Sequence, residues 1–202
     1  MEILLATGNA HKKEELSRII APHTVLTPQD AGIVFDAEET GSTYLENALI
    51  KAEALWEAAG GRPVLSDDSG LSVPALGGAP GVYSARYGSK PGQAELSAAE
   101  RNALLLKNME SFSGEQRRAF FVCCMVLVAA PYRVFTVQET FSGSIARAPS
   151  GSGGFGYDPV FLLPGSSRSV AELPAGEKDA VSHRGRAGMR MLAILNSLEE
   201  QK

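Results

Sequence analysis

The stretch RRAFFVCCMVLVAAPYRVFTVQETFSGSIA, residues 117–146, decides the fold. Two long runs rich in β-branched and aromatic residues are separated only by Pro131 and Tyr132. Two such runs joined by so short a turn predict an antiparallel hairpin. The chain before the hairpin alternates between strand-like and helix-like patterns, so the sequence predicts an α/β protein with a mixed β-sheet.

The segments before and after the hairpin supply the other elements. Strands are expected at residues 2–6 (EILLA), 25–26, 34–35, 62–66 (RPVLS) and 160–163 (VFLL). Helices are expected at residues 11–20, 95–109 and 186–198, where apolar residues recur at helical spacing. A further helix should begin at Thr43, which forms a capping-box pattern with Glu46, and should end at Gly60 and Gly61.

Composition excludes several classes of protein. The 202 residues suit one domain of ordinary size, and the net charge of −4 provides no basic field for nucleic acid. Cys123 and Cys124 are adjacent in an apolar run, which predicts buried thiols and a reducing compartment. No signal peptide or membrane-spanning run is recognisable. We therefore expect a cytoplasmic protein with no membrane or nucleic-acid partner.

The stretch LSDDSGL, residues 65–71, is the first candidate for chemistry. Asp67 and Asp68 should point to opposite sides of an extended chain, with Asp68 beyond the strand end, near a turn at Gly70. An aspartate there could hold Mg²⁺ and polarise or deprotonate a water. The alternative is a surface turn. Glu38 and Glu39 add carboxylates for a metal, or form only a solvated acidic helix start.

The segment ATGNAHK, residues 6–12, links a strand to a helix through Thr7, Gly8 and Asn9. This arrangement aims backbone amides and a helix N-terminus at a phosphate, although it lacks the spacing of a Walker A loop. Lys12 shares a helical row with core-facing Leu16 and should point into a cleft, whereas Lys13 should face solvent. The alternative is an ordinary capped helix with two solvated lysines.

The segment GSGGFGYDP, residues 151–159, matches the dinucleotide fingerprint, but Pro159 and a strand-like run follow it where that fingerprint needs a helix. We therefore interpret it as a loop that presents Phe155, Tyr157 and Asp158. An aromatic residue on such a loop is a plausible platform for stacking on a base. The alternative is that Phe155 packs in the core.

The segment EKDAVSHRGRA, residues 177–187, groups Lys178, His183, Arg184 and Arg186. These donors suit the acceptor-rich edge of a ligand or a phosphate. A metal site is disfavoured because the stretch offers too few ligands. The alternative is a solvated basic helix start.

Together, the ordered segments ATGNAHK, AEETGSTYLENALIKA, DDSGLSVPALGGAPGVYSARYG, GGFGYDPVF and EKDAVSHRGRA resemble the inosine/xanthosine triphosphate pyrophosphatases, over nearly the whole chain. The resemblance implies one domain over residues 1–202, with an elongated mixed sheet flanked by helices and two lobes around a central cleft. It also implies a homodimer. The implied reaction is Mg²⁺-dependent cleavage of ITP, dITP and XTP between the α and β phosphates.

The resemblance also implies roles for individual residues. Asp68 would be the general base and a metal ligand, and Glu39 a second metal ligand with Glu38 as the alternative. The expected substrate contacts come from four segments: Thr7, Gly8, Asn9, Ala10, His11 and Lys12 for the triphosphate; Ser69 nearby; Phe155, Gly156, Tyr157 and Asp158 around the nucleoside; and Lys178, His183 and Arg184 reading the base. Lys51 is a further candidate for the phosphates.

Two rival functions stand beside this one. A pyrophosphatase of pyrimidine triphosphates is disfavoured because SHR, residues 182–184, matches the purine-specific pattern. A non-catalytic purine nucleotide sensor has no need of Asp67, Asp68 and Glu39 together.

Overall fold

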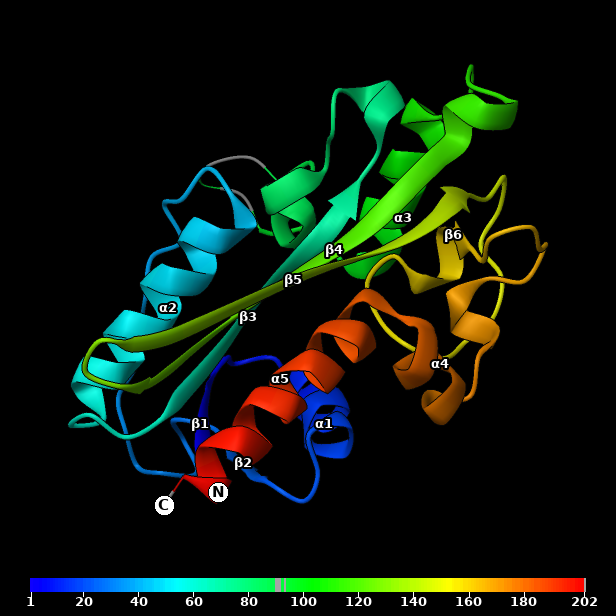
Figure 1. Ribbon diagram of the computed structural model, residues 1–202. Helices are drawn as coiled ribbons and strands as arrows, with labels where there is room; N and C mark the ends of the chain where they lie inside the picture. Colours follow the sequence, from blue (N-terminus) through cyan, green and yellow to red (C-terminus); the bar gives the residue numbers. More distant parts are fainter. Residues whose placement is uncertain (90–91, 93, 202) are drawn as a thin grey trace. The chain divides into compact units, whose positions relative to one another are not determined.

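The computed structural model describes residues 1–89, 92 and 94–201 and contains a six-stranded sheet in the order β2-β1-β3-β4-β5-β6 (Figure 1). β1 (Glu2–Ala6) pairs in parallel with β2 (Thr24–Leu26) and β3 (Val64–Ser72). β4 (Arg118–Ala130) and β5 (Arg133–Ile145) form the hairpin, and β5 pairs antiparallel with β6 (Phe161–Leu162). The predicted α/β class with a mixed sheet is confirmed.

Five α-helices accompany the sheet in the described part of the chain: α1 (Ala10–Ile19), α2 (Tyr44–Ala58), α3 (Ala98–Asn108), α4 (Ala175–Val181) and α5 (His183–Glu200). The capping box of α2 is confirmed, because Thr43 Oγ1 accepts the backbone N–H of Glu46 at 3.1 Å. Gly60 and Gly61 follow this helix with positive φ angles of 65° and 85°, as its predicted end requires.

The chain divides into two compact units. Unit 1 comprises residues 1–68, 123–139 and the segment from His183 onward, and unit 2 comprises residues 69–122 and 140–182. The boundaries fall inside β3, β4 and β5, so each unit contains part of these strands. The single two-lobed domain and its central cleft stay predictions.

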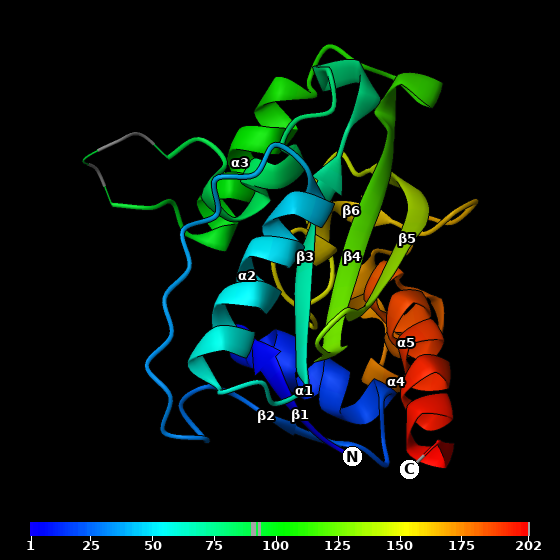
Figure 2. The ribbon, with the colours of Figure 1, turned by 60° about the vertical axis from the view of Figure 1, so that its left-hand side comes forward.

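Alternating side chains give unit 1 two buried layers. Ile3 and Leu5 of β1 pack in a cluster with α1 and α5, whereas Leu4 and Ala6 pack in a cluster with α2. The helices therefore cover opposite faces of the strands, as Figure 2 shows for α2 and α5. Side chains of β3 alternate in the same way, so neighbouring residues of that strand face α1 and α5 or face α2 in turn.

Unit 2 has a separate apolar core. Phe161 lies at its centre, with ring centroids 4.5 Å from Phe121 and 5.6 Å from Phe141. Leu105 from α3 is buried in the same cluster. Tyr157 is buried in this core, which therefore fixes the position of the segment around it.

Several predicted elements differ from the structure. The strand expected at residues 34–35 is wrong: Val34 is 95% exposed, and Phe35 packs beside the α2 cluster from a segment without strand structure. α4 was not predicted, and α5 begins at His183 instead of Arg186. Two consecutive apolar residues resemble a strand in sequence, but a strand also needs a neighbouring backbone to pair with, and no described strand pairs with Val34 and Phe35.

Cys123 and Cys124 are free and buried, as predicted. Within the described residues, none of the helices has the length and apolar character needed to cross a membrane.

Candidate active site

Asp67 and Asp68 lie inside β3 and are only 1% and 6% exposed. The surface-turn alternative is therefore wrong, and so is the expectation that Asp68 follows the strand end, because β3 continues to Ser72. Gly70 serves close packing: an added Cβ would lie 2.4 Å from Ser84 Oγ and 2.6 Å from the carbonyl oxygen of Gly81. The strand can continue there because glycine leaves room for this neighbouring segment.

Asp67 faces the α1 and α5 side, where four donor groups surround its carboxylate. Arg184 donates from Nε to Oδ2 at 3.2 Å and from Nη2 to Oδ1 at 3.3 Å. Cys123 Sγ lies 2.9 Å from Oδ2, and Lys12 Nζ forms an ion pair with Oδ1. Burial alone would raise the pKa of Asp67, but the charges of Arg184 and Lys12 hold it well below its usual range. Asp67 is therefore an ionised carboxylate that anchors these four donor groups.

The main-chain oxygen of Asp67 has a different role. It accepts from Lys51 Nζ at 3.0 Å and from Lys12 Nζ at 3.3 Å. Lys12 comes from the first turn of α1 and Lys51 from the middle of α2. One backbone oxygen thus holds together two cations from helices on opposite faces of the sheet. The predicted inward position of Lys12 is confirmed, whereas Lys13 pairs with Asp30 at the surface.

Asp68 faces the α2 side, where Lys51 and Asn47 contact its carboxylate. Lys51 Nζ lies 3.3 Å from its Oδ1, and Asn47 Nδ2 donates to its Oδ2 at 3.4 Å. Burial is the strongest influence on the pKa of Asp68 and raises it; Lys51 and Lys12 offset this only partly, and the carboxylates of Glu39 and Asp67 raise it further. A carboxylate with a raised pKa is a better proton acceptor than an ordinary aspartate.

Glu39 completes this side of the site. Its Oε1 lies 2.6 Å from Lys51 Nζ, and the side chain is 28% exposed, whereas Glu38 is exposed. Glu39 and Asp68 therefore converge on the same ammonium group. Among the described residues, no group of three or more His, Cys, Asp or Glu side chains is arranged as a metal-binding cluster.

The loop before α1 forms a helix cap. Asn9 Oδ1 accepts the backbone N–H groups of His11 at 3.0 Å and Lys12 at 3.3 Å, and Thr7 Oγ1 accepts that of Asn9 at 3.1 Å. Gly8 and Ala10 are exposed between them. The capped helix of the alternative interpretation is present, but its Lys12 is not merely solvated. The predicted triphosphate contacts of this loop stay a prediction.

A second polar cluster lies in unit 2. Lys178 Nζ donates to Asp158 Oδ2 at 2.6 Å and lies 4.7 Å from the centroid of the Phe155 ring. Asp158 Oδ2 also accepts the backbone N–H of Phe155 at 2.8 Å. We call these three residues the Lys178 cluster. Phe155 is absent from the apolar core clusters of the described chain, so the cluster holds an aromatic face and an ammonium group together.

The neighbouring residues have structural contacts. The Tyr157 hydroxyl donates to the carbonyl of Ser84 at 2.8 Å, and Asn102 Nδ2 donates to the carbonyl of Gly156 at 3.0 Å. Tyr157 therefore belongs to the core of unit 2. Its contact with the nucleoside stays a prediction. Ser69, half-buried, is the first residue of unit 2.

The sequence matches the model of the Ham1 family over residues 3–194. The chain belongs to the Ham1 family. Curated relatives include a dITP/XTP pyrophosphatase of Treponema denticola, 50% identical over 93% of this chain and 94% of the relative. Another, from Thermus thermophilus, carries the same name and is 46% identical over 93% of this chain and 88% of the relative. The resemblance inferred from the motifs is confirmed.

Solved structures of Ham1 proteins share the fold. A HAM1 protein from Coxiella burnetii is 37% identical, with a TM-score of 0.85 over 98% of this chain and 99% of that chain. A dITP/XTP pyrophosphatase from Mycobacterium abscessus is 41% identical, with a TM-score of 0.74 over 95% of this chain and 99% of that chain.

The predicted base-reading set of this Ham1 chain is divided between two groups. Lys178 lies in its cluster in unit 2, whereas Arg184 is 2% exposed and binds Asp67 and, through Nη1 at 2.8 Å, Glu15. His183 precedes it at the start of α5 and is also buried. The structure thus assigns Arg184 an anchoring contact that the sequence did not suggest.

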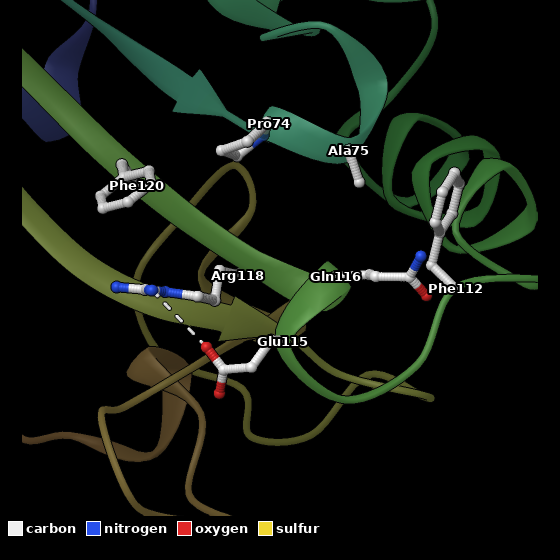
Figure 3. Close-up of a pocket in the computed structure, with 7 residues that line it drawn as sticks. All are labelled: Pro74, Ala75, Phe112, Glu115, Gln116, Arg118 and Phe120. Carbon is white, nitrogen blue, oxygen red and sulfur yellow. Dashed lines mark ion pairs between the residues drawn. The ribbon is translucent and has the colours of Figure 1, made fainter.

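A hollow in unit 2 contains none of the predicted site residues (Figure 3). Its lining is mainly apolar, with an ion pair of 3.5 Å between Glu115 and Arg118 at its edge. The lining residues are Pro74, Ala75, Phe112, Glu115, Gln116, Arg118 and Phe120. This hollow lacks the paired cations that a polyphosphate requires.

Sequence reasoning missed Asn47, Glu15 and Cys123. Asn47 had a usable signal, because it lies four residues before Lys51 on the buried face of α2, where a polar residue needs a partner. Glu15 likewise lies among core positions of α1. Cys123 gave no signal beyond its apolar surroundings.

Proposed function

We propose that this protein is a nucleoside triphosphate pyrophosphatase that hydrolyses ITP, dITP and XTP to the monophosphate and pyrophosphate. The observation that carries the proposal is Asp68, a buried carboxylate with a raised pKa, beside two lysines gathered on the main-chain oxygen of Asp67. A general base and a pair of cations are the groups that hydrolysis of a phosphoanhydride needs. The names of the relatives support the same substrates.

Lys12 and Lys51 would bind the phosphates. Their ammonium groups are held by Asp67, so they need little ordering when a substrate arrives. The half-buried Thr7 and the exposed Gly8 are close in sequence to Lys12 and would add polar contacts to the triphosphate. Pre-positioned cations of this kind stabilise charge that develops on phosphate oxygens in the transition state.

Asp68 would act as the general base. It takes a proton from a water whose oxygen attacks the α-phosphorus, while the bond from that phosphorus to the α–β bridging oxygen breaks. Pyrophosphate leaves with the bridging oxygen, and the monophosphate keeps the water oxygen. Asn47 and Lys51 hold one carboxylate oxygen of Asp68 each, which orients the carboxylate for this transfer.

The residues present fit a Mg²⁺ ion. Glu39 and Asp68 both contact the Lys51 ammonium, so two carboxylates already converge on a cation. Mg²⁺ commonly uses one or two carboxylates together with substrate phosphates and water. Bound there, the ion would neutralise phosphate charge and stabilise the leaving pyrophosphate.

The Lys178 cluster would read the purine. Phe155 offers a stacking face, and Lys178 offers a donor to the keto oxygen at position 6 of hypoxanthine and xanthine. Adenine carries a donor at that position, so a donor would face a donor. Arg184, held by Asp67 and Glu15, would support the phosphate side of the site.

We further propose a homodimer in the cytoplasm. The dimer follows from the family resemblance, and the compartment is consistent with two free, buried thiols.

The test is pyrophosphate release from ITP, XTP, ATP and GTP, with Mg²⁺ and with a chelator. We expect metal-dependent release from ITP and XTP far above that from ATP and GTP. Equal release from all four would overturn the base assignment but keep the phosphate chemistry. Tight binding of ITP without release would favour the nucleotide sensor.

A further inference from the structure

Two residues of α2, Lys51 and Asn47, each bridge the segment of residues 39–41 to the carboxylate of Asp68. Lys51 contacts Glu39 Oε1 at 2.6 Å and Asp68 Oδ1 at 3.3 Å. Asn47, one turn earlier, accepts the backbone N–H of Gly41 through Oδ1 at 2.8 Å and donates to Asp68 Oδ2 at 3.4 Å. Each bridge thus has one end on the segment of residues 39–41 and the other on a different oxygen of Asp68.

The Asn47 bridge is enclosed and tightly packed. Asn47 is fully buried, and both ends of its amide have partners. At Gly41, an added Cβ would lie 2.6 Å from Glu46 Cβ and 2.7 Å from Asn47 Oδ1. Only glycine lets the segment carrying Glu39 lie this closely on the start of α2. The position of Glu39 is therefore tied to the same side chain that orients Asp68.

We propose that Asn47 is a positioning residue that sets the placement of the Glu39 and Asp68 carboxylates for a divalent cation; this inference rests on the proposed function. A bound divalent cation would repel the Lys51 ammonium group. It would not repel the neutral amide of Asn47, so the Asn47 bridge can persist when the cation binds. Residues that orient metal ligands through hydrogen bonds typically change metal affinity by roughly 10- to 100-fold when they are removed.

The experiment measures binding of an ITP analogue with a non-hydrolysable α–β link, by calorimetry with and without Mg²⁺. The readout is the gain in analogue affinity that Mg²⁺ produces in the wild type, in Asn47→Ala and in Thr43→Ala. Thr43→Ala is the matched control, because it weakens the start of the same helix without touching Asp68. Asn47→Ser replaces Asn47→Ala if the alanine variant does not fold, since serine is too short to reach both partners.

We expect the Mg²⁺-dependent gain to fall by about 10-fold or more in the Asn47 variant and to stay unchanged in Thr43→Ala. An unchanged gain in the Asn47 variant overturns the inference, and so does an equal loss in Thr43→Ala. A wild type that shows the gain but releases no pyrophosphate from ITP overturns the proposed function instead. In that case, comparing the Mg²⁺-dependent gain in analogue affinity between the wild type and the variants still tests the role of Asn47.

Discussion

Asp67 and Asp68 are consecutive residues of one strand, yet their carboxylates face opposite sides of it and have pKa values shifted in opposite directions. Asp67 is paired with Arg184 and Lys12, which favour its charged form. Asp68 is buried with weaker compensation. Alternation along β3 thus separates an ionised anchor from a proton acceptor by a single peptide unit.

Replacing the general base should slow turnover strongly. We expect Asp68→Asn to lower kcat for ITP by roughly 10²- to 10⁴-fold, because the amide has the shape of the carboxylate but takes no proton. Steady-state kinetics measure the loss, and circular dichroism checks the fold. Asp30→Asn, at the surface, serves as the control and should keep full activity. A near-normal rate in Asp68→Asn would remove this residue from catalysis.

The acid limb of the pH–rate profile should report Asp68. The base must be ionised, so kcat/KM falls as the pH drops through a pKa that lies above the ordinary 3.8. Lys51→Met removes an ammonium group that lowers this pKa, so the acid limb should move to higher pH while the maximal rate also falls. A limb that stays in place or moves to lower pH would contradict the assigned contact.

Breaking the Asp67 anchor should destabilise the protein. Asp67→Asn removes one of the two carboxylates that pair with the buried Arg184 guanidinium and leaves only Glu15, so we expect a loss of up to about 3–5 kcal/mol, the cost of breaking a buried ion pair. Urea unfolding at pH 7 measures the change in the free energy of unfolding.

The same variant gives a check by pH. The folded-state pKa of Asp67 lies below the unfolded value near 3.8, so its contribution to stability is present above that pH. It is lost as the pH falls through the folded-state pKa. The difference between wild type and Asp67→Asn should therefore shrink in strong acid, and a constant difference would argue against a role for this charge.

Base selection should depend on Lys178. We expect Lys178→Met to reduce the ratio of kcat/KM for ITP to that for ATP by roughly 10-fold or more, since the donor for the keto oxygen is gone. Competition assays with both nucleotides give the ratio directly. Lys107→Met, on the exposed side of α3, is the matched control. An unchanged ratio in Lys178→Met would exclude this lysine as the reader of the base.

Local sequence signals predicted much of the fold. The hairpin around Pro131 and the capped helix after Thr43 were predictable because their signals lie within a few residues of each other. The strand expected at Val34 failed because strand formation depends on a partner elsewhere in the chain. β3 was expected to end too early because Gly70, which looks like a turn residue, serves close packing with Ser84.

The site could be predicted only in part for a similar reason. Asp68 and Lys12 were found because each belongs to a compact motif. The contact of Arg184 with Glu15 joins residues 169 positions apart, and that of Cys123 with Asp67 joins residues 56 apart. Such pairs follow from how strands and helices stack, which no short motif records.

The carbonyl oxygen of Asp67 belongs to the peptide backbone and exists whatever side chain occupies that position. Exchanging the side chain removes the anchor but leaves an acceptor for both lysines. A family built on this strand could therefore change its acidic residue during evolution without dispersing its phosphate-binding charges. A designer transplanting the site would need to copy the path of the strand before copying its side chains.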